Sequence, residues 1–224
     1  MKKYYDHDFW HQQKLKSIHK DPFKYKAAQA VFVMDALSYE NAPGPCDLLD
    51  LGCGIGDISL AFAEQGYKVT GLEYSGVAHK ESLALAKKAK LPVNFVRGDV
   101  LEADALSLGR WSFVTAVNLL HCLVMDSDRK KFFAVLKKLL KPDGVFYLSS
   151  MCGIPGEAIV RHTKIDKSTR IGSNGTRIHL EAETILSEIS ASGLEILERR
   201  TFTHMNDRER GFETSDISVI GKTA

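Results

Sequence analysis

The sequence lacks any apolar run long enough to cross a bilayer, and its first residues, MKKYYDHDFW, lack the apolar segment of a secretory signal. It also lacks a charge imbalance, because 30 Lys and Arg residues stand against 28 Asp and Glu residues. A basic nucleic-acid footprint spread over the whole surface is therefore excluded. These absences lead us to expect a cytoplasmic protein that binds neither a membrane nor nucleic acid.

Cysteine is scarce, and the four cysteines form no C-x-x-C pair and no His/Cys ligand spacing. Free thiols in a reducing compartment are expected, and no structural zinc is indicated. His7 and His11 stand four residues apart, but no third ligand with suitable spacing accompanies them. We therefore expect a surface histidine pair and no metal site.

The length and composition of the chain fit one ordinary globular domain. The 224 residues are 44% hydrophobic and 26% charged, which is typical of a single α/β domain with a substantial core. A second full domain does not fit this length. We expect a monomer or a homodimer.

The most informative stretch is CDLLDLGCGIG, residues 46–56. Its first half is a short apolar run of the length that a buried parallel strand needs, and glycines 52, 54 and 56 begin where that run ends. Glycine lets backbone approach a ligand closely. Asp57 follows as a predicted N-cap of a helix running to about Gly66. The pattern predicts strand, loop and helix, with a ligand on the loop.

The spacing of these glycines argues against a phosphate ligand. A dinucleotide fingerprint needs Gly-x-Gly-x-x-Gly with the pyrophosphate at the helix N-terminus. Here the last glycine position holds Asp57, and a carboxylate repels a phosphate.

Two further acids lead to a family resemblance. Asp50 precedes the glycine loop, and Glu73 ends the next strand, KVTGLEYS. This arrangement resembles the class I S-adenosylmethionine (SAM)-dependent methyltransferases, whose reaction leaves S-adenosylhomocysteine. The resemblance implies that the loop holds the amino-acid part of SAM and that Glu73 takes both ribose hydroxyls. A carboxylate suits that role because it only accepts hydrogen bonds and can receive two hydroxyls at once.

The resemblance continues along residues 46–150. A strand within 92–100 ends at Asp99, where the family places an acid near the adenine amino group, and Val100 presents a backbone N–H there. A fourth strand lies within 110–121, and a helix over 126–141 is stopped by the KPDG that follows Leu140. The phrase LKPDGVFYLSS then resembles the fifth strand of many members.

The implied fold is a doubly wound, Rossmann-like α/β domain with a seven-stranded, mostly parallel sheet whose last strand is antiparallel. The remaining helices are expected over 23–39, 76–90 and 180–192. Two closing strands, LEILERRTF and DISVIGKTA, are expected on either side of a polar turn, HMNDRERG. The methyltransferase domain is predicted over 23–224, after an arm over 1–22.

The predicted cofactor contacts follow the resemblance. Asn118 and Leu119 follow the fourth strand. Trp10 belongs to the aromatic arm, which we expect to close over the pocket, the alternatives being a solvated arm and aromatic residues that pack on the core. The full set of predicted SAM-binding residues is Asp50, Gly52, Gly54, Gly56, Glu73, Tyr74, Asp99, Val100, Asn118, Leu119 and Trp10.

Acceptor binding is predicted in the segment 151–179, the main departure from the family plan. Asn174–Gly175 suits a type I′ turn and predicts a hairpin there. A purely structural hairpin is the alternative to a role in acceptor binding. His121 can serve as a base near neutral pH, or it can be a buried, hydrogen-bonded imidazole; Cys122 is expected to pack rather than react. The predicted acceptor-site residues are Tyr4, Tyr5, His121, Met151, Arg161 and His162.

Two motifs that would indicate a nucleic-acid acceptor are missing from the sequence. The Asn/Asp-Pro-Pro-aromatic motif of base amino-methylation is absent, and Pro45–Cys46 precedes the first strand rather than following the fourth, as cytosine-C5 chemistry requires. We therefore expect methyl transfer to a small molecule. Two alternatives stay open: an NAD(P)-dependent oxidoreductase on the same sheet, and a SAM-binding regulator without catalysis.

Overall fold

The computed structural model describes residues 12, 16, 22–102, 107–153, 159–160, 163–164, 166, 168–172, 177–207 and 212–224. Several predicted features lie outside the described residues: Tyr4, Tyr5, Trp10, Arg161, His162 and the turn Asn174–Gly175. Within the described part of the chain, no helix is long and apolar enough to span a membrane.

The described chain forms a seven-stranded sheet in the order β3-β2-β1-β4-β5-β9-β8. The pairs from β3 to β5 are parallel, and β9 is antiparallel to both of its neighbours, β5 and β8. This confirms the predicted doubly wound α/β fold and its antiparallel last strand. The sheet strands are β1 (Asp47–Leu51), β2 (Lys68–Glu73), β3 (Asn94–Arg97), β4 (Trp111–Val117), β5 (Leu140–Cys152), β8 (Leu194–Asp207) and β9 (Phe212–Thr223).

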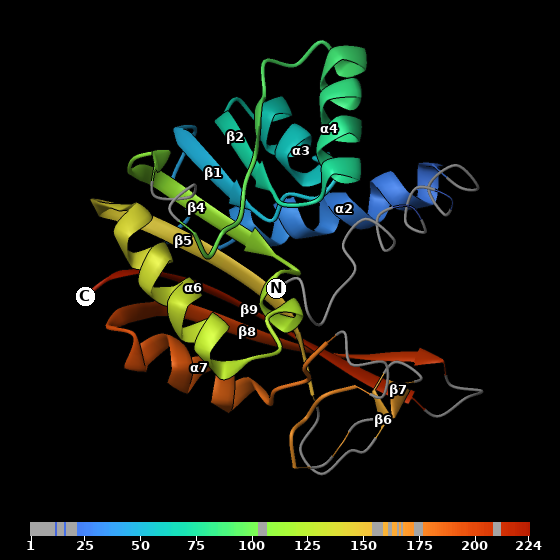
Figure 1. Ribbon diagram of the computed structural model, residues 1–224, viewed down its shortest axis with the longest axis vertical. Helices are drawn as coiled ribbons and strands as arrows, with labels where there is room; N and C mark the ends of the chain where they lie inside the picture. The colour runs from blue at the N-terminus through green and yellow to red at the C-terminus, as the bar shows by residue number, and fades with distance from the viewer. Residues whose placement is uncertain are drawn as a thin grey trace.

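Helices cover both faces of this sheet (Figure 1). The helices and short turns are α2 (Pro22–Leu37), α3 (Asp57–Glu64), α4 (Gly76–Ala89), η1 (Leu120–Cys122), α6 (Asp126–Leu139) and α7 (Ala182–Ala191). Neighbouring residues of β1 point to opposite faces: Leu48 joins the core cluster beneath α2 and α3, and Leu49 joins the one beneath α6 and α7. The continuous apolar run of β1 is thus explained by burial on both faces.

Helix α6 ends earlier than predicted. It stops at Leu139, and Leu140 already has extended backbone (φ −80°, ψ 137°) and pairs with Trp111 of β4. The KPDG sequence, residues 141–144, therefore belongs to β5, and the prediction that KPDG stops the helix is wrong. The reason is tertiary, because Leu140 is buried at 2% exposure in the sheet core.

The closing strands are longer than predicted. Strand β8 runs to Asp207 because its ladder with β9 continues through His204 opposite Thr214 and Met205 opposite Glu213. The predicted polar turn over 204–211 is therefore half strand. Helix α7 spans Ala182–Ala191, slightly shorter than predicted.

The segment after β5 extends beyond the carboxyl ends of the parallel strands (Figure 1). It contains a two-stranded ribbon, β6 (Ile159–Val160) with β7 (Thr163–Lys164), which the sequence did not reveal. Further along, Ile171 pairs antiparallel with Ile178, and the Gly172 amide donates to the Arg177 carbonyl at 2.9 Å. These flanks agree with the predicted hairpin.

Candidate functional site

The loop after β1 is built from left-handed backbone. The φ values of Gly52, Gly54 and Gly56 are 67°, 59° and 80°. This left-handed conformation costs a residue with a side chain about 1–2 kcal/mol. The amides of Gly52 and Cys53 donate to the Leu72 carbonyl at 2.8 and 3.1 Å. The loop is thereby fixed to the end of β2 and presents bare backbone at the carboxyl edge of the sheet.

The start of helix α3 corrects one prediction. The N-cap is Gly56, and Asp57 is the first helical residue, so the assignment of Asp57 as N-cap is wrong by one position. A glycine fits there because the cap residue is left-handed and a Cβ on it would lie 2.3 Å from the Phe95 ring. Asp57 still places a negative charge in the first turn, where it interacts favourably with the positive end of the helix dipole.

Asp50 lies at the end of β1 and is 2% exposed. Its two carboxylate oxygens accept hydrogen bonds from the Ser59 hydroxyl at 2.6 Å and the Thr115 hydroxyl at 2.9 Å. Burial raises the pKa of Asp50 to about 6, although both hydroxyl bonds act to lower it. The carboxylate is thus held rigidly between β4 and α3, directly before the glycine loop.

Glu73 ends β2 and is 4% exposed. Its Oε2 accepts a hydrogen bond from the Gly54 amide at 2.9 Å, and its Oε1 accepts one from the Ser75 amide at 2.7 Å. Each carboxylate oxygen has a second lone pair beyond these bonds. The glycine loop and Glu73, 19 residues apart in the chain, are therefore one unit.

The end of β3 adds the next predicted residues. The Gly98 amide donates to the Glu73 backbone carbonyl at 3.0 Å, which brings the two strand ends together. Asp99 Oδ1 accepts a hydrogen bond from the Leu101 amide at 2.9 Å, and Val100 is buried at 2% exposure. Tyr74 follows Glu73 directly, and its carbonyl accepts a hydrogen bond from Arg97 Nε at 3.5 Å.

The loop after β4 meets the glycine loop from the other side. Asn118 is left-handed at φ 57°, and its amide donates to the Ser149 carbonyl of β5 at 2.8 Å. Leu119 is buried against Gly52, where an added Cβ would lie 2.9 Å from Leu119 Cδ1. The predicted residues from β1, β2, β3 and β4 thus gather at one edge, but their roles toward SAM stay predictions.

His121 lies in η1 and is 4% exposed. Its Nδ1 stands 3.3 Å from the Ser150 hydroxyl, and its backbone carbonyl accepts a hydrogen bond from the Ile178 amide at 2.9 Å. The segment after β5 is therefore bonded directly to the loop that carries His121. Met151 follows Ser150 on β5 and is itself buried at 4% exposure.

A buried arginine holds the far end of the same loop. Arg129 of α6 donates to the carbonyls of Leu123 and Val124 at 3.1 and 3.0 Å. Its guanidinium also binds the Glu188 carboxylate of α7, with the shortest contact at 2.8 Å. This arrangement connects α6, α7 and the loop after η1.

Cys122 has the properties of a packing residue. Burial raises the pKa of its thiol to about 11, although Arg177 acts to lower it. Little thiolate forms near neutral pH at such a pKa, and the thiolate is the nucleophilic species. This agrees with the expectation that Cys122 packs rather than reacts.

Sequence reasoning missed the residues that hold the predicted ones in place. Ser59, Thr115, Ser75 and Ser150 each contact a predicted site residue through a hydroxyl or an amide. Serine and threonine are common at many surface and turn positions, so nothing in their spacing distinguishes these four.

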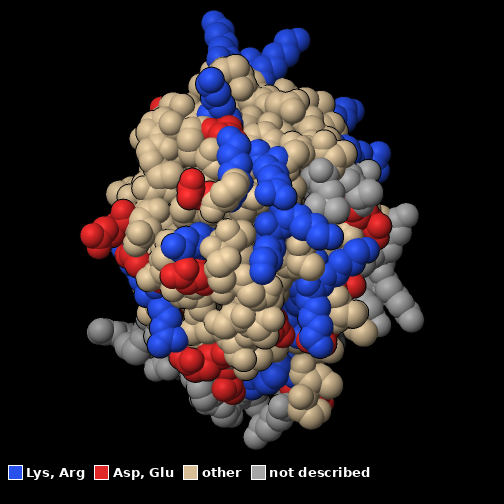
Figure 2. Space-filling model, turned by 90° about the vertical axis from the view of Figure 1, so that its left-hand side faces the viewer, with Lys and Arg blue, Asp and Glu red and all other residues tan. Residues whose placement is uncertain are grey.

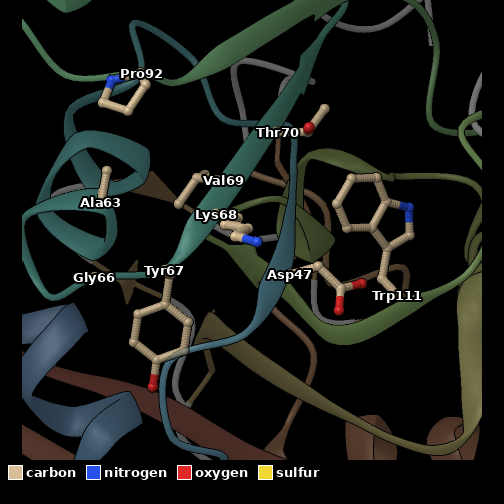
Figure 3. Close-up of a pocket in the computed structure, with 9 residues that line it drawn as sticks. All are labelled: Asp47, Ala63, Gly66, Tyr67, Lys68, Val69, Thr70, Pro92 and Trp111. Carbon is tan, nitrogen blue, oxygen red and sulfur yellow. The ribbon is translucent and has the colours of Figure 1, made fainter.

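A cavity of about 490 Å³ lies elsewhere, at the amino ends of β1, β2 and β4. Figure 3 shows its lining on both sides of β2, with Ala63, Val69 and Pro92 on one side and Asp47 and Trp111 on the other. This edge is opposite the glycine loop and Glu73. We therefore assign the candidate site to the carboxyl edge, where the shaped backbone and the buried carboxylates lie.

Comparisons with known proteins bear on the family of this chain. Residues 48–144 match the family model described as "Methyltransferase domain". A protein of Geobacillus sp. (strain WCH70) named as a methyltransferase is 29% identical over 122 residues, which are 54% of this chain and 48% of that protein.

Two other relatives have names that differ in acceptor. A ubiquinone biosynthesis O-methyltransferase of Methylobacterium nodulans is 31% identical over 104 residues, 46% of this chain and 40% of that protein. An RNA methyltransferase, by name, of Halalkalibacterium halodurans is 33% identical over 117 residues, 51% of this chain and 24% of that protein. The matches therefore span less than half the length of each of these relatives.

The similarity of fold extends over nearly the whole chain. A SAM-dependent methyltransferase structure from Clostridium acetobutylicum ATCC 824 superposes with a TM-score of 0.69 at 15% identity, covering 95% of this chain and 99% of that one. At this identity the superposition shows the fold alone. The domain model over residues 48–144, the methyltransferase relatives and the shared fold together support a class I SAM-dependent methyltransferase.

Proposed function

We propose that this chain transfers the methyl group of SAM to a small-molecule acceptor. The observation that carries the proposal is the placement of Glu73, a buried carboxylate fixed by the Gly54 and Ser75 amides beside the glycine loop. Its remaining lone pairs can accept the two ribose hydroxyls, while the left-handed loop backbone lies against the amino-acid part. The residues present thus fit SAM.

The acid at the start of α3 supports SAM over a nicotinamide dinucleotide. A pyrophosphate would have to lie at this helix N-terminus, where Asp57 occupies the first turn. Buried Asp50 and Glu73 add negative charge around the same loop. This charge disfavours a phosphate and suits the cationic groups of SAM.

The chemistry asks little of the protein. SAM supplies a methyl group on a positively charged sulfur, which is already activated for in-line displacement. The chain has to hold the acceptor at near-attack distance in a dry site and, where the acceptor requires it, remove a proton. Asn118 and His121, on the loop after β4, are the residues we propose beside the acceptor.

The acceptor side is proposed to be formed by the arm and by residues 151–179. The position of the latter supports this, because the Ile178 amide binds the His121 carbonyl at the carboxyl edge. The relative named for ubiquinone biosynthesis favours a small acceptor, whereas the relative named for RNA does not. The balanced charge of this chain and the lack of a base-methylation motif favour the small molecule.

Calorimetry followed by turnover assays tests the proposal. SAM and S-adenosylhomocysteine are expected to bind and NADH is not. Methyl transfer is then measured on a panel of amines, thiols and hydroxyls, with total RNA as a parallel substrate. NADH binding would favour the oxidoreductase, SAM binding without turnover the regulator, and methylated RNA a macromolecular acceptor.

Replacing residues 169–179 by a short Gly/Ser turn separates the donor site from the acceptor site. SAM affinity is expected to stay within about 0.5 kcal/mol, as for changes away from a binding site, while turnover of the acceptor found in the panel is lost. Equal loss of binding and turnover would make this segment part of the donor site or of the fold. Retained turnover would place acceptor recognition elsewhere.

Amide exchange tests the proposed closure of the arm over the cofactor. Its aromatic residues are too apolar to remain solvated, and a sulfonium attracts aromatic faces. Adding SAM should slow exchange over residues 1–20 more than adding S-adenosylhomocysteine, which lacks the positive charge. Equal protection with and without ligand would indicate fixed core packing instead.

A further inference from the structure

A cation lies inside the protein where α6 and α7 pack together. Arg129 of α6 is only 5% exposed. The two helices cover the same face of the sheet, since Leu136 of α6 and Ile189 of α7 belong to one core cluster. Removing a guanidinium from water is costly, so a fold retains a buried one only where its N–H groups are well paired. The partners of Arg129 therefore indicate what this residue does.

Each nitrogen of this guanidinium has a partner. Nε donates to both carboxylate oxygens of Glu188, at 3.1 and 2.9 Å, and Nη2 donates to Glu188 Oε1 at 2.8 Å. Nη1 donates to the carbonyls of Leu123 and Val124 at 3.1 and 3.0 Å. Nη2 also lies 3.7 Å from Asp126 Oδ1. Because the guanidinium is a rigid planar fork, it holds a carboxylate of α7 and two successive carbonyls of the loop after β4 in one fixed geometry.

The two carbonyls lie at the end of the loop between β4 and α6. At the start of this loop the Asn118 amide donates to the Ser149 carbonyl at 2.8 Å, and in its middle the His121 carbonyl accepts from the Ile178 amide at 2.9 Å. The start and the middle are therefore held by backbone bonds. Arg129 holds the end through its side chain. Changing this side chain releases the end of the loop while the backbone donors and acceptors of the other two points remain.

Helix α7 also anchors the segment after β5. The Gly153 amide donates to the Leu180 carbonyl at 2.8 Å, and Gly153 pairs with Glu181, the N-cap of α7. Glu188 lies about two turns further along this helix. The ion pair between α6 and α7 thereby joins the loop after β4 to the segment after β5, the two described parts of the chain that are proposed to form the acceptor side.

We propose that Arg129 is a positioning residue for methyl transfer, which holds the loop carrying Asn118 and His121 against α7 and so sets where the acceptor stands relative to the methyl group. This inference rests on the proposed function. An in-line displacement is sensitive to such placement, because a shift of about 1 Å can cost about 100-fold in rate. The proposed donor site is held by other bonds, those of the amides that bind Glu73. Arg129 therefore affects the acceptor step and not the binding of the donor.

Three variants separate the fork, the buried charge and a neighbouring surface charge. Arg129→Lys keeps the positive charge and loses the planar fork. The double variant Arg129→Met/Glu188→Leu removes both charges together, so that neither is left buried without its partner. Lys130→Gln is the matched control, because Lys130 is the next residue of α6 and pairs with Asp126 at the surface, where the two side chains are 76% and 58% exposed.

The full-length variants are compared in turnover of the acceptor found in the panel, in calorimetry with S-adenosylhomocysteine, in amide exchange and in urea unfolding. We expect kcat to fall by about 10- to 100-fold in Arg129→Lys and in the double variant, while the Kd of S-adenosylhomocysteine stays within about twofold. The amides of Cys122, Leu123 and Ile178 exchange faster, and those of β1 and β4 keep their rates. The urea midpoint of the double variant stays close to that of the wild type, because an apolar pair replaces a buried ion pair. Lys130→Gln matches the wild type in every measurement.

Wild-type kcat in Arg129→Lys or in the double variant overturns the inference, and so does unchanged amide exchange in the loop. Equal loss of S-adenosylhomocysteine binding and turnover also overturns it, because that result indicates a general structural role. A raised acceptor KM with unchanged kcat overturns it as well, since the loop would then bind the acceptor without setting its geometry.

Two further outcomes remain decisive. If the double variant does not fold, Arg129→Lys decides by the same measurements. Absence of any methyl transfer in the wild type refutes the proposed function instead. Amide exchange needs no turnover, so it then still decides whether Arg129 holds the loop.

Discussion

Strand β1 carries two aspartates, Asp47 and Asp50, three residues apart. Their surroundings at the two edges of the sheet shift the pKa of the same kind of side chain in opposite directions. Among the described residues, Asp50 at the carboxyl edge accepts hydrogen bonds from two hydroxyls, and burial raises its pKa to about 6. Burial also acts to raise the pKa of Asp47 at the amino edge, but hydrogen bonds from Ser112 and Lys141 lower it overall.

The surroundings of each edge explain this contrast. Helices that return antiparallel to the strands end at the amino edge, and lysines occupy the last turns of α4 (Lys87, Lys88) and α6 (Lys137, Lys138), where they complement the helix dipoles. Figure 2 shows this face, with Lys and Arg side chains over much of its centre and top. The carboxyl edge instead collects Asp50, Asp57 and Glu73. The amino edge stabilises a carboxylate with a cation, and the carboxyl edge holds its buried carboxylates with hydroxyl and amide donors.

The largest expected effect compares a glycine from each edge. Gly56→Ala combines left-handed strain with a Cβ 2.3 Å from Phe95, so unfolding free energy should fall by about 2–5 kcal/mol. Gly109→Ala, before β4, has the same strain at φ 84° but nothing within 4 Å of its Cβ. We expect it to lose only about 1–2 kcal/mol in urea unfolding. Equal losses would show that packing beneath the loop is unimportant.

The pH dependence of stability should have opposite signs for the two aspartates. The pKa of Asp50 is raised in the folded state, so this group contributes stability at pH values below its pKa in the unfolded chain, and the contribution is lost as the pH rises through about 6. Between about pH 4 and 7 the unfolding free energy of the wild type should therefore fall by roughly 2–3 kcal/mol relative to that of Asp50→Asn. The pKa of Asp47 is lowered in the folded state, so this group contributes stability at pH values above its pKa in the unfolded chain. That contribution is lost as the pH falls through its pKa in the folded protein. Urea unfolding measures the first effect with Asp50→Asn across this range and the second with Asp47→Asn from about pH 5 down to about pH 2. Two pH dependences of the same sign would contradict the contrast.

SAM binding should depend on a carboxylate at the carboxyl edge of the sheet and not on one at the amino edge. Glu73→Ala is expected to weaken SAM binding by about 1.5–3 kcal/mol, the range for hydrogen bonds to a charged group. The matched control, Asp47→Asn, removes a carboxylate charge at the opposite edge and should leave SAM affinity unchanged in calorimetry. Normal affinity in Glu73→Ala would remove the ribose assignment.

The smallest effect is expected for the ion pair at the amino edge. Lys141 lies 2.9 Å from Asp47, but both side chains are partly exposed, at 45% and 32%. Lys141→Met should therefore lower unfolding free energy by at most about 1 kcal/mol, and salt should diminish the difference. A larger, salt-independent loss would mean that this edge shields its charges from solvent as the other does.

The sequence was sufficient for the local pieces of the proposed donor site. The apolar run before Gly52, the glycine spacing and the acids at 50 and 73 are adjacent or nearly adjacent signals, and each lies where predicted. The boundary errors occurred where long-range pairing overrode local signals. Leu140 joined the sheet instead of the helix, and His204 extended a ladder instead of forming a turn.

By itself the sequence determined the order of the strands of the main sheet and of the helices that cover it, because alternating apolar periodicity and glycine breaks are local properties of the chain. The tertiary structure alone decided which groups face each carboxylate and imidazole. Ser59 and Thr115 reach Asp50, and Ser150 reaches His121, only after the strands pair and the helices pack. Hydrogen bonds act over about 3 Å, so contacts between residues 29 or 65 positions apart exist only once the fold has formed.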